Sequence, residues 1–204
     1  MDYNPFVNET IRTIHARHSI RLFADRDVSE QDIQTILTAA NAAPSAHNRQ
    51  SWRFILVRGK KKEELAHLAS SKAGDFPRPA SVLLRMAART VASAPLVVAV
   101  ANTGELIRHG DRLFRIDVAA SHDFFRTMEI QSSAAAVENL LLAATSLGLA
   151  SVWLGILFLI KDDVLHLLGE PQGEFMAVVP VGYAAKESKG PQKRPLEKIV
   201  RTVE

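Results

Sequence analysis

The apolar run LVVAVA, residues 96–101, is the feature that most constrains the fold of this chain. It follows Pro95 and contains only valine, leucine and alanine, with no polar residue at alternate positions. A strand with this composition is buried on both of its faces. The run therefore predicts the central strand of a sheet that has helices packed against it.

Apolar spacing predicts the other elements. Strands are expected at 52–57, 150–156 and 175–183. Helices are expected from Asn4-Pro5 onward through Val7, Ile11 and Ile14, between Ser29 and Pro44, and at 61–71, 81–92, 133–148 and 162–168. Strands and helices are mixed without strict strand–helix–strand alternation, which favours an α+β fold over a doubly wound sheet. No repeat or linker divides the 204 residues, so a single domain over 1–204 is expected.

Two segments carry further expectations. Around the helix predicted at 133–148, the apolar side chains nearly encircle the axis, so we expect it to be buried all round; they are Val137, Leu140, Leu141, Leu142, Ala144 and Leu147. Between about 104 and 128 the pattern is weak, with charges and aromatics mixed. Either a flap that covers a substrate or a surface helix fits that region.

Composition excludes several classes of chemistry. The chain has no cysteine, which excludes disulfides, thiolate metal sites, iron–sulfur clusters and cysteine nucleophiles. Only His15 and His18 are close together among the histidines, and Arg17 between them disfavours a cation, so no metal site is expected. The basic stretch 58–62 is interpreted as a solvated turn that opens a helix, and nucleic-acid binding is not expected.

Membrane and dinucleotide motifs are also missing. Met1 is followed by Asp2 rather than an apolar run, and the most apolar stretch, 149–160, is too short to span a membrane. A cytoplasmic protein is therefore expected. The glycines form neither G-x-G-x-x-G nor a P-loop, and G-x-S-x-G and H-E-x-x-H are absent. A chain without an obvious nucleophile often leaves the difficult chemistry to a cofactor.

Two short stretches combine polar groups in an unusual order. In RHSIRLF, residues 17–23, Arg17, Ser19 and Arg21 share one face if the chain is extended. This pattern fits an edge strand with a solvated face, and it also fits an anion-binding face. In PSAHNRQSW, residues 44–52, Asn48 and Gln50 can face the same way if extended. Their carboxamides suit either a polar turn or the pyrimidine edge of a flavin.

Together these stretches resemble motifs of the nitroreductase family of FMN-dependent oxidoreductases. RHSIRLF is similar to R-x-S-x-[RK]-x-F, and PSAHNRQSW is similar to P-S-x-x-N-x-Q-P-W. GLASVWLGI and KRPLEKIV match two later landmarks, so the resemblance covers about residues 11–200. One departure is Ser51, where the family usually has proline.

The resemblance implies an α+β fold with a central mixed or antiparallel sheet, in an intertwined homodimer that binds FMN at its interface. It implies four groups of flavin-binding residues: Arg17, His18, Ser19 and Arg21 from one subunit; Pro44, Ser45, Ala46, Asn48 and Gln50 from the other; Leu154 and Gly155, with the Gly155 backbone N–H facing flavin N5; and Lys193 and Arg194 at the phosphate. No side chain need act as an acid or base.

The implied activity is ping-pong transfer of hydride from NAD(P)H through FMN to a small-molecule acceptor such as a nitroaromatic or a quinone. The nicotinamide and the acceptor would use the same place in turn, which agrees with the missing dinucleotide motif. A specialised family activity remains open, namely reductive dehalogenation, flavin cleavage or deazaflavin modification. A non-catalytic flavin-binding protein also remains open.

Overall fold

The computed structural model describes residues 8–113 and 117–204, and the predicted helix start at Asn4-Pro5 lies outside these residues. Its four strands form one sheet in the order β1-β2-β4-β3, with antiparallel pairing throughout. The strands are β1 (Trp52–Val57), β2 (Leu96–Asn102), β3 (Ala150–Ser151) and β4 (Glu174–Gly182). All residues of β2 are buried, so the predicted central strand and the α+β class are confirmed.

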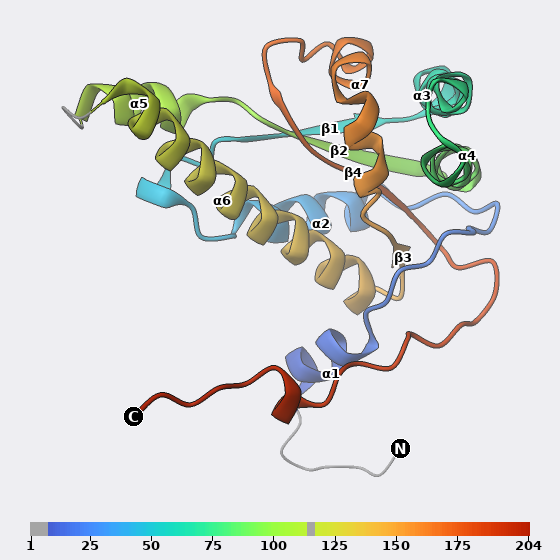
Figure 1. The fold of residues 1–204 in the computed structure, drawn as a ribbon. Helices are drawn as coiled ribbons and strands as arrows, with labels where there is room; N and C mark the ends of the chain where they lie inside the picture. Colours follow the sequence, from blue (N-terminus) through green and yellow to red (C-terminus); the bar gives the residue numbers. More distant parts are fainter. Residues whose placement is uncertain (1–7, 114–116) are drawn as a thin grey trace.

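Helices cover both faces of this sheet (Figure 1). They are α1 (Glu9–Ala16), α2 (Glu30–Asn41), α3 (Gly59–Lys72), α4 (Arg78–Ser93), α5 (Glu105–Leu113), α6 (Val118–Ser146) and α7 (Lys161–Leu168). Side chains alternate between the two faces of β2. Val97 and Ala99 pack in the core that α3, α4 and α7 cover. Val98 and Val100 pack in the core that α2 and α6 cover. Two core layers therefore share one central strand.

The region 104–128 contains α5 and the first part of α6. Helix α6 has 29 residues and begins at Val118, where the Asp117 carboxylate accepts a hydrogen bond from Ala120 N at 3.0 Å. Helix α5 packs closely on it, because a Cβ added at Gly110 would lie 2.1 Å from the ring of Phe125. The region 104–128 is thus part of a pair of packed helices. The helix predicted at 133–148 corresponds to the second half of α6.

The prediction that this second half is buried all round is wrong for the single chain. Val137, Leu140 and Ala144 are buried, but Leu147 is 37% exposed and Glu138 is exposed. The buried residues face α2 and the sheet, so one side of α6 remains outside the core of this chain.

Two predicted strands are shorter than expected. The segment 150–156 pairs with β4 only at Ala150 and Ser151, and the 3₁₀-helix η3 (Gly155–Ile160) follows. Beyond β3, Leu154 N still donates to Val178 O at 2.9 Å, so the chain leaves the sheet gradually. The segment 17–23 is extended but makes only isolated bridges, a parallel one from Ser19 to Ser151 and an antiparallel one from Phe23 to Ala184.

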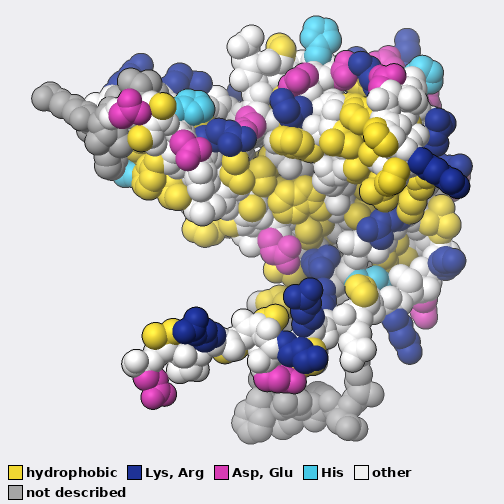
Figure 2. Space-filling model, in the orientation of Figure 1, with side chains coloured by type: hydrophobic (Ala, Val, Ile, Leu, Met, Phe, Trp, Pro, Cys, Tyr) yellow, Lys and Arg dark blue, Asp and Glu magenta, His cyan; other side chains and the backbone are white. Residues whose placement is uncertain are grey.

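The last residues of the chain form an arm away from the sheet (Figure 1). Residues 185–204 are exposed throughout and contain one short 3₁₀-helix, η4 (Leu196–Lys198). Figure 2 shows an open hollow between the body of the molecule and the lower arm formed by α1 and this tail. Among the described helices, none is long and apolar enough to cross a lipid bilayer.

Candidate functional site

The segment 17–21 lies between β3, α6 and the beginning of the tail. Ile20 N donates to Ser151 O at 3.1 Å, which fixes the segment beside the sheet. The His18 ring nitrogens lie 2.9 Å from Ala16 O and 3.0 Å from the Ser188 hydroxyl, so His18 links the segment to the tail. The Arg17 side chain is 20% exposed, and its Nε lies 3.8 Å from the exposed carboxylate of Glu138.

Arg21 and Gly155 line one pocket of about 140 Å³. Its other walls come from α4 and from the chain after β3: Leu83, Met86, Ala87, Thr90, Trp153, Leu154 and Ile156. Gly155 begins η3, where the first backbone N–H groups have no partner within the helix, and nothing lies within 4 Å of a Cβ added to it. The structure thus brings the predicted Arg21, Leu154 and Gly155 together.

Sequence reasoning missed the contribution of α4 to this pocket. Leu83 and Met86 are 48% and 44% exposed although both are apolar, and Val82 beside them is 47% exposed. A helix that packs one face on a core does not require apolar residues on the opposite face. Stretch 81–92 has more apolar residues than one buried helix face needs, and this surplus could have predicted a binding surface on the helix.

The segment 44–50 has a strained backbone. His47, Asn48 and Gln50 have φ of 52°, 52° and 49°, in the left-handed region that residues other than glycine seldom occupy. Gln50 N donates to the Ser45 hydroxyl at 3.0 Å, and the Gln50 amide donates to Asn48 Oδ1 at 3.1 Å. Of the two conformations that the sequence left open, the structure has the polar turn rather than the extended chain, and the 3₁₀-helix η1 (Ala46–Asn48) precedes the contact between the two amides.

Strained residues of this kind persist only where surrounding contacts hold them, and they concentrate at functional sites. Ala46 N donates to the Ser132 hydroxyl of α6 at 3.1 Å, and Thr103 N donates to Ser51 O at 3.0 Å. Pro44 and Asn48 are exposed beside these anchors.

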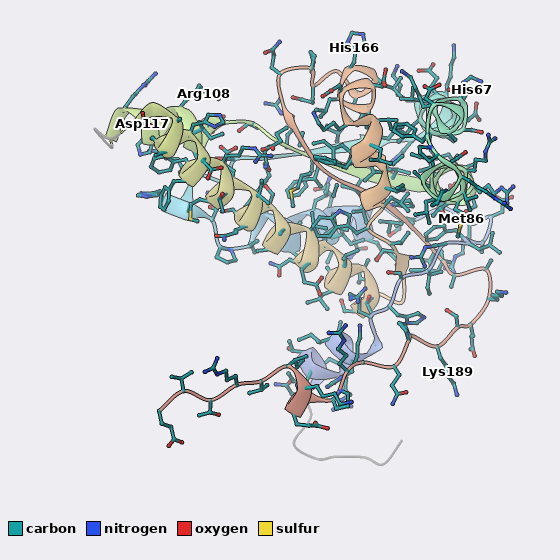
Figure 3. The ribbon with its side chains drawn as sticks, viewed as in Figure 1. His67, Met86, Arg108, Asp117, His166 and Lys189 are labelled. Carbon is teal, nitrogen blue, oxygen red and sulfur yellow. The ribbon has the colours of Figure 1, made fainter. Side chains whose placement is uncertain are left out.

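The structure does not bring segments 17–21 and 44–50 together within one chain. Arg17 meets α6 at Glu138 and Ala46 meets it at Ser132, and six residues turn a helix through about 600°, which places the two contacts on different faces. In Figure 3, Met86 of the Arg21 pocket and Arg108 of α5 lie at opposite ends of the molecule. Lys193 and Arg194 are exposed in the tail.

Helix α5 adds basic groups beside segment 44–50. The Arg49 guanidinium lies 2.8 Å from the His109 imidazole, and the rings of His47 and His109 are 6.2 Å apart. Burial lowers the pKa of His109, and the positive charges of Arg49, His47 and Arg112 lower it further. The lowered pKa favours the neutral form of the His109 ring beside Arg49.

A buried carboxylate positions α5. Glu129 of α6 is 1% exposed, and it accepts hydrogen bonds from Leu106 N at 2.7 Å and Gly104 N at 3.2 Å. Burial raises the pKa of Glu129, whereas these backbone donors oppose the shift. The Ser51 hydroxyl lies near this carboxylate without a hydrogen bond of regular geometry. Sequence reasoning did not identify Glu129, because a lone glutamate in a helix carries no distinguishing signal.

No group of three or more histidine and acidic side chains in the described part of the chain is arranged to hold a metal ion.

Comparison with known proteins agrees with the fold and the motifs. The model of the nitroreductase family matches residues 14–183. An Archaeoglobus fulgidus protein that bears the name NADH dehydrogenase/NAD(P)H nitroreductase is 30% identical, over 89% of this chain and 88% of its own. The structure of Bacillus megaterium NfrA2 is 25% identical with a TM-score of 0.77, over 96% of this chain and 74% of that one.

A nitroreductase from Desulfovibrio desulfuricans, whose structure holds FMN, has the same fold. It is 24% identical with a TM-score of 0.73, and the match covers 97% of this chain and 98% of that one. The family match spans most of the chain and includes segment 17–21, segment 44–50 and Gly155. This chain belongs to the nitroreductase family.

Proposed function

We propose that the protein is an FMN-dependent oxidoreductase that takes electrons from NAD(P)H and passes them to a small-molecule acceptor such as a nitroaromatic or a quinone. The observation that carries the proposal is the pocket shared by Arg21 and Gly155, a cation and an open backbone segment. The name of the Archaeoglobus relative supports the nicotinamide donor. The FMN of the Desulfovibrio protein supports the flavin.

The residues present fit a flavin mononucleotide. Arg17 and Arg21 are cations on one extended segment, which suits a ligand with a phosphate at one end and a polar ring at the other. The pocket of about 140 Å³ is smaller than the roughly 300–1,000 Å³ usual for a ligand site. One chain therefore encloses only part of the flavin, and segment 44–50 of a second chain would complete the site.

The chain's own groups bind and orient rather than react. The Gly155 backbone would help to hold the ring of FMN, which when bound would supply the chemistry of hydride transfer. Leu83 and Met86 give the pocket an apolar wall that excludes water from the ring. Arg17 would hold the phosphate together with Lys193 and Arg194, His18 would fix the tail through Ser188, and Asn48 and Gln50 would line the ring from the second chain.

The homodimer is part of this proposal. The exposed tail carries apolar side chains that the described part of the chain leaves open: Leu196, Ile199, Val200 and Val203 are 59–80% exposed. Ile11 and Ile14 of α1 are also 38% and 45% exposed. A second copy seated in the hollow of Figure 2 would cover these residues and the outer side of α6.

We expect the full chain to sediment as a dimer at micromolar concentration. Removal of residues 191–204 should weaken the dimer, because it deletes the apolar arm, and should also release flavin, because it deletes Lys193 and Arg194. The double variant Lys193→Ala and Arg194→Ala is the matched control, since it should lose flavin and remain dimeric. A full-length chain that sediments as a flavin-bound monomer would contradict the dimer.

The activity is tested by cofactor retention and kinetics. Protein incubated with excess FMN and dialysed should keep about one flavin per chain and oxidise NADH or NADPH with menadione as acceptor. Because one place serves both substrates in turn, double-reciprocal plots should be parallel. A protein that retains no flavin overturns the proposal, and intersecting lines would require a separate nicotinamide site. Flavin recovered intact after turnover in air would exclude flavin cleavage.

A further inference from the structure

Arg49 is a cation without an acidic partner. Its guanidinium lies 2.9 and 2.8 Å from Nδ1 and Nε2 of His109, and among the described side chains no carboxylate forms an ion pair with it. The neighbouring arginines of the same stretch differ, because Arg53 pairs with Glu170 at 3.1 Å and Arg58 pairs with Glu30. Arg49 is thus held in place by a group that does not neutralise it.

His109 is suited to this holding role. Its pKa is lowered, first by burial and then by the charges around it, so the ring stays neutral and can accept a hydrogen bond from Arg49. The interaction uses one terminal nitrogen of a guanidinium that has five N–H donors. The other donors of Arg49 are available to a planar anion such as a carboxylate or a phosphate.

Among the side chains that the structure describes, those that act electrostatically on His109 are basic. His47, Arg49, His109 and Arg112 form a group that we call the basic cluster, and His47, Arg49 and Arg112 each act on His109 as positive neighbours. Arg108 is not part of it, because its guanidinium turns back to Thr103 O at 3.0 Å. Gathering like charges costs free energy, which an anionic ligand would recover.

The backbone under the cluster is also held at a cost. His47 lies at φ 52° in η1, and strain of this kind costs roughly 1–3 kcal/mol per residue. The Ser132 hydroxyl anchors η1 through Ala46 N, and Glu129 anchors α5 through Leu106 N, both from the rigid core of α6. Two segments distant in sequence are therefore fixed so that Arg49 and His109 meet.

We propose that the basic cluster binds an anionic group carried by one of the two substrates, a phosphate monoester or a carboxylate, at the edge of the flavin site. The inference rests on the proposed function, which places segment 44–50 beside the flavin. Two sources share this chemistry. One is the 2′-phosphate that distinguishes NADPH from NADH, and the other is a carboxylate on an aromatic acceptor.

The test compares matched pairs of substrates in the Arg49→Gln variant, which keeps a hydrogen-bond donor for His109 and removes the charge. The pairs are NADPH with NADH, and 4-nitrobenzoate with nitrobenzene. A charge-assisted hydrogen bond corresponds to roughly tenfold or more in affinity, so the KM of the anionic member of one pair should rise by that factor. Its kcat and the KM of the neutral member should stay nearly unchanged. Arg53→Gln, with its charge paired to Glu170, is the control and should leave every KM within about twofold.

The pair that responds identifies the source of the anion. Equal changes in both members of each pair, or no change in either pair, would overturn the inference. Calorimetric titration with 2′,5′-ADP, 5′-AMP and 4-nitrobenzoate gives a reading that does not depend on turnover. If the wild type neither retains flavin nor oxidises NADH or NADPH, the proposed function fails, while weaker binding of 2′,5′-ADP or 4-nitrobenzoate by Arg49→Gln would still support the basic cluster. Equal binding of all three by both proteins would contradict it.

Discussion

Replacement of Glu129 by alanine is expected to lower the free energy of unfolding by about 3–5 kcal/mol. The carboxylate accepts from Leu106 N and Gly104 N in a position that is 1% exposed. Each buried donor left without an acceptor costs roughly 1–3 kcal/mol, and the lost side chain leaves a cavity beside them. In a chain of this length the melting temperature should fall by roughly 10 °C, which thermal denaturation measures directly.

Gln131→Ala is the matched control for this change. Gln131 is exposed on the same helix two residues away, so its replacement should alter the free energy of unfolding by less than about 0.5 kcal/mol. An equal loss of unfolding free energy in both variants would mean that α6 tolerates no substitution in this turn. A loss below about 1 kcal/mol in Glu129→Ala would show that α5 does not depend on this carboxylate.

The pH dependence of the same site has a definite sign. Burial raises the pKa of Glu129 in the folded protein above that of the unfolded chain. The folded state therefore holds the proton more tightly, and this contribution to stability is fully present below the unfolded pKa of about 4.3. It is lost as pH rises through the folded pKa. The stability of the wild type relative to Glu129→Gln, which does not titrate, should therefore decline as pH rises from about 4 towards neutrality.

The same glutamate explains why the sequence did not predict the start of α6. Buried positions along that helix include Ser121, Glu129, Ser132 and Ser133, all polar, so the apolar periodicity is interrupted where the helix is nonetheless buried. Periodicity could identify the stretch after residue 133, where alanine, valine and leucine resume. The polar positions have partners that only the tertiary structure supplies, such as Asn102 Oδ1, which accepts from the Ser133 hydroxyl.

The limits of the central strand were predictable, but the end of the third strand was not. LVVAVA lies between Pro95 and polar residues, which set its limits. The run at 149–160 is apolar throughout, and an uninterrupted apolar run does not distinguish a strand from a buried helical turn. After Ser151 it leaves the sheet and forms η3, which places Gly155 at the pocket of Arg21.

The candidate site likewise combines residues that the sequence identified with residues that only the structure revealed. The flavin residues proposed from motifs lie in short local stretches: 17–21, 44–50, 154–155 and 193–194. Leu83, Met86 and Thr90 reach the pocket through the packing of α4, and His109 reaches Arg49 through the packing of α5. No local pattern encodes these two contacts, because each joins segments that are distant in the sequence. We expect these side chains of α4 and α5 to determine acceptor specificity.

Arg17→Ala and Arg21→Ala are expected to have different effects on a bound flavin. Four extended residues span about 13 Å, too far for both side chains to hold one phosphate easily. Among the described residues, the ion-pair partner of Arg17 is distant, with 3.8 Å from its Nε to Glu138, and we assign Arg17 to the phosphate. Arg21 lines the pocket with Gly155, and we assign it to the N1 and O2 side of the ring.

Reduction by two electrons can leave negative charge at N1, so a cation beside that edge stabilises the reduced flavin selectively. A charge-assisted hydrogen bond contributes roughly 1.5–3 kcal/mol, which equals about 30–65 mV for a two-electron couple. Arg21→Ala should therefore lower the flavin potential by about that amount and slow reduction by the nicotinamide. Arg17→Ala should raise the dissociation constant of FMN and leave the potential of the bound flavin nearly unchanged. Spectroelectrochemistry on both variants, each saturated with FMN, measures the two potentials, and the two arginines serve as controls for each other. Equal shifts, or a shift in the Arg17 variant alone, would show that the assignment of the two residues is wrong.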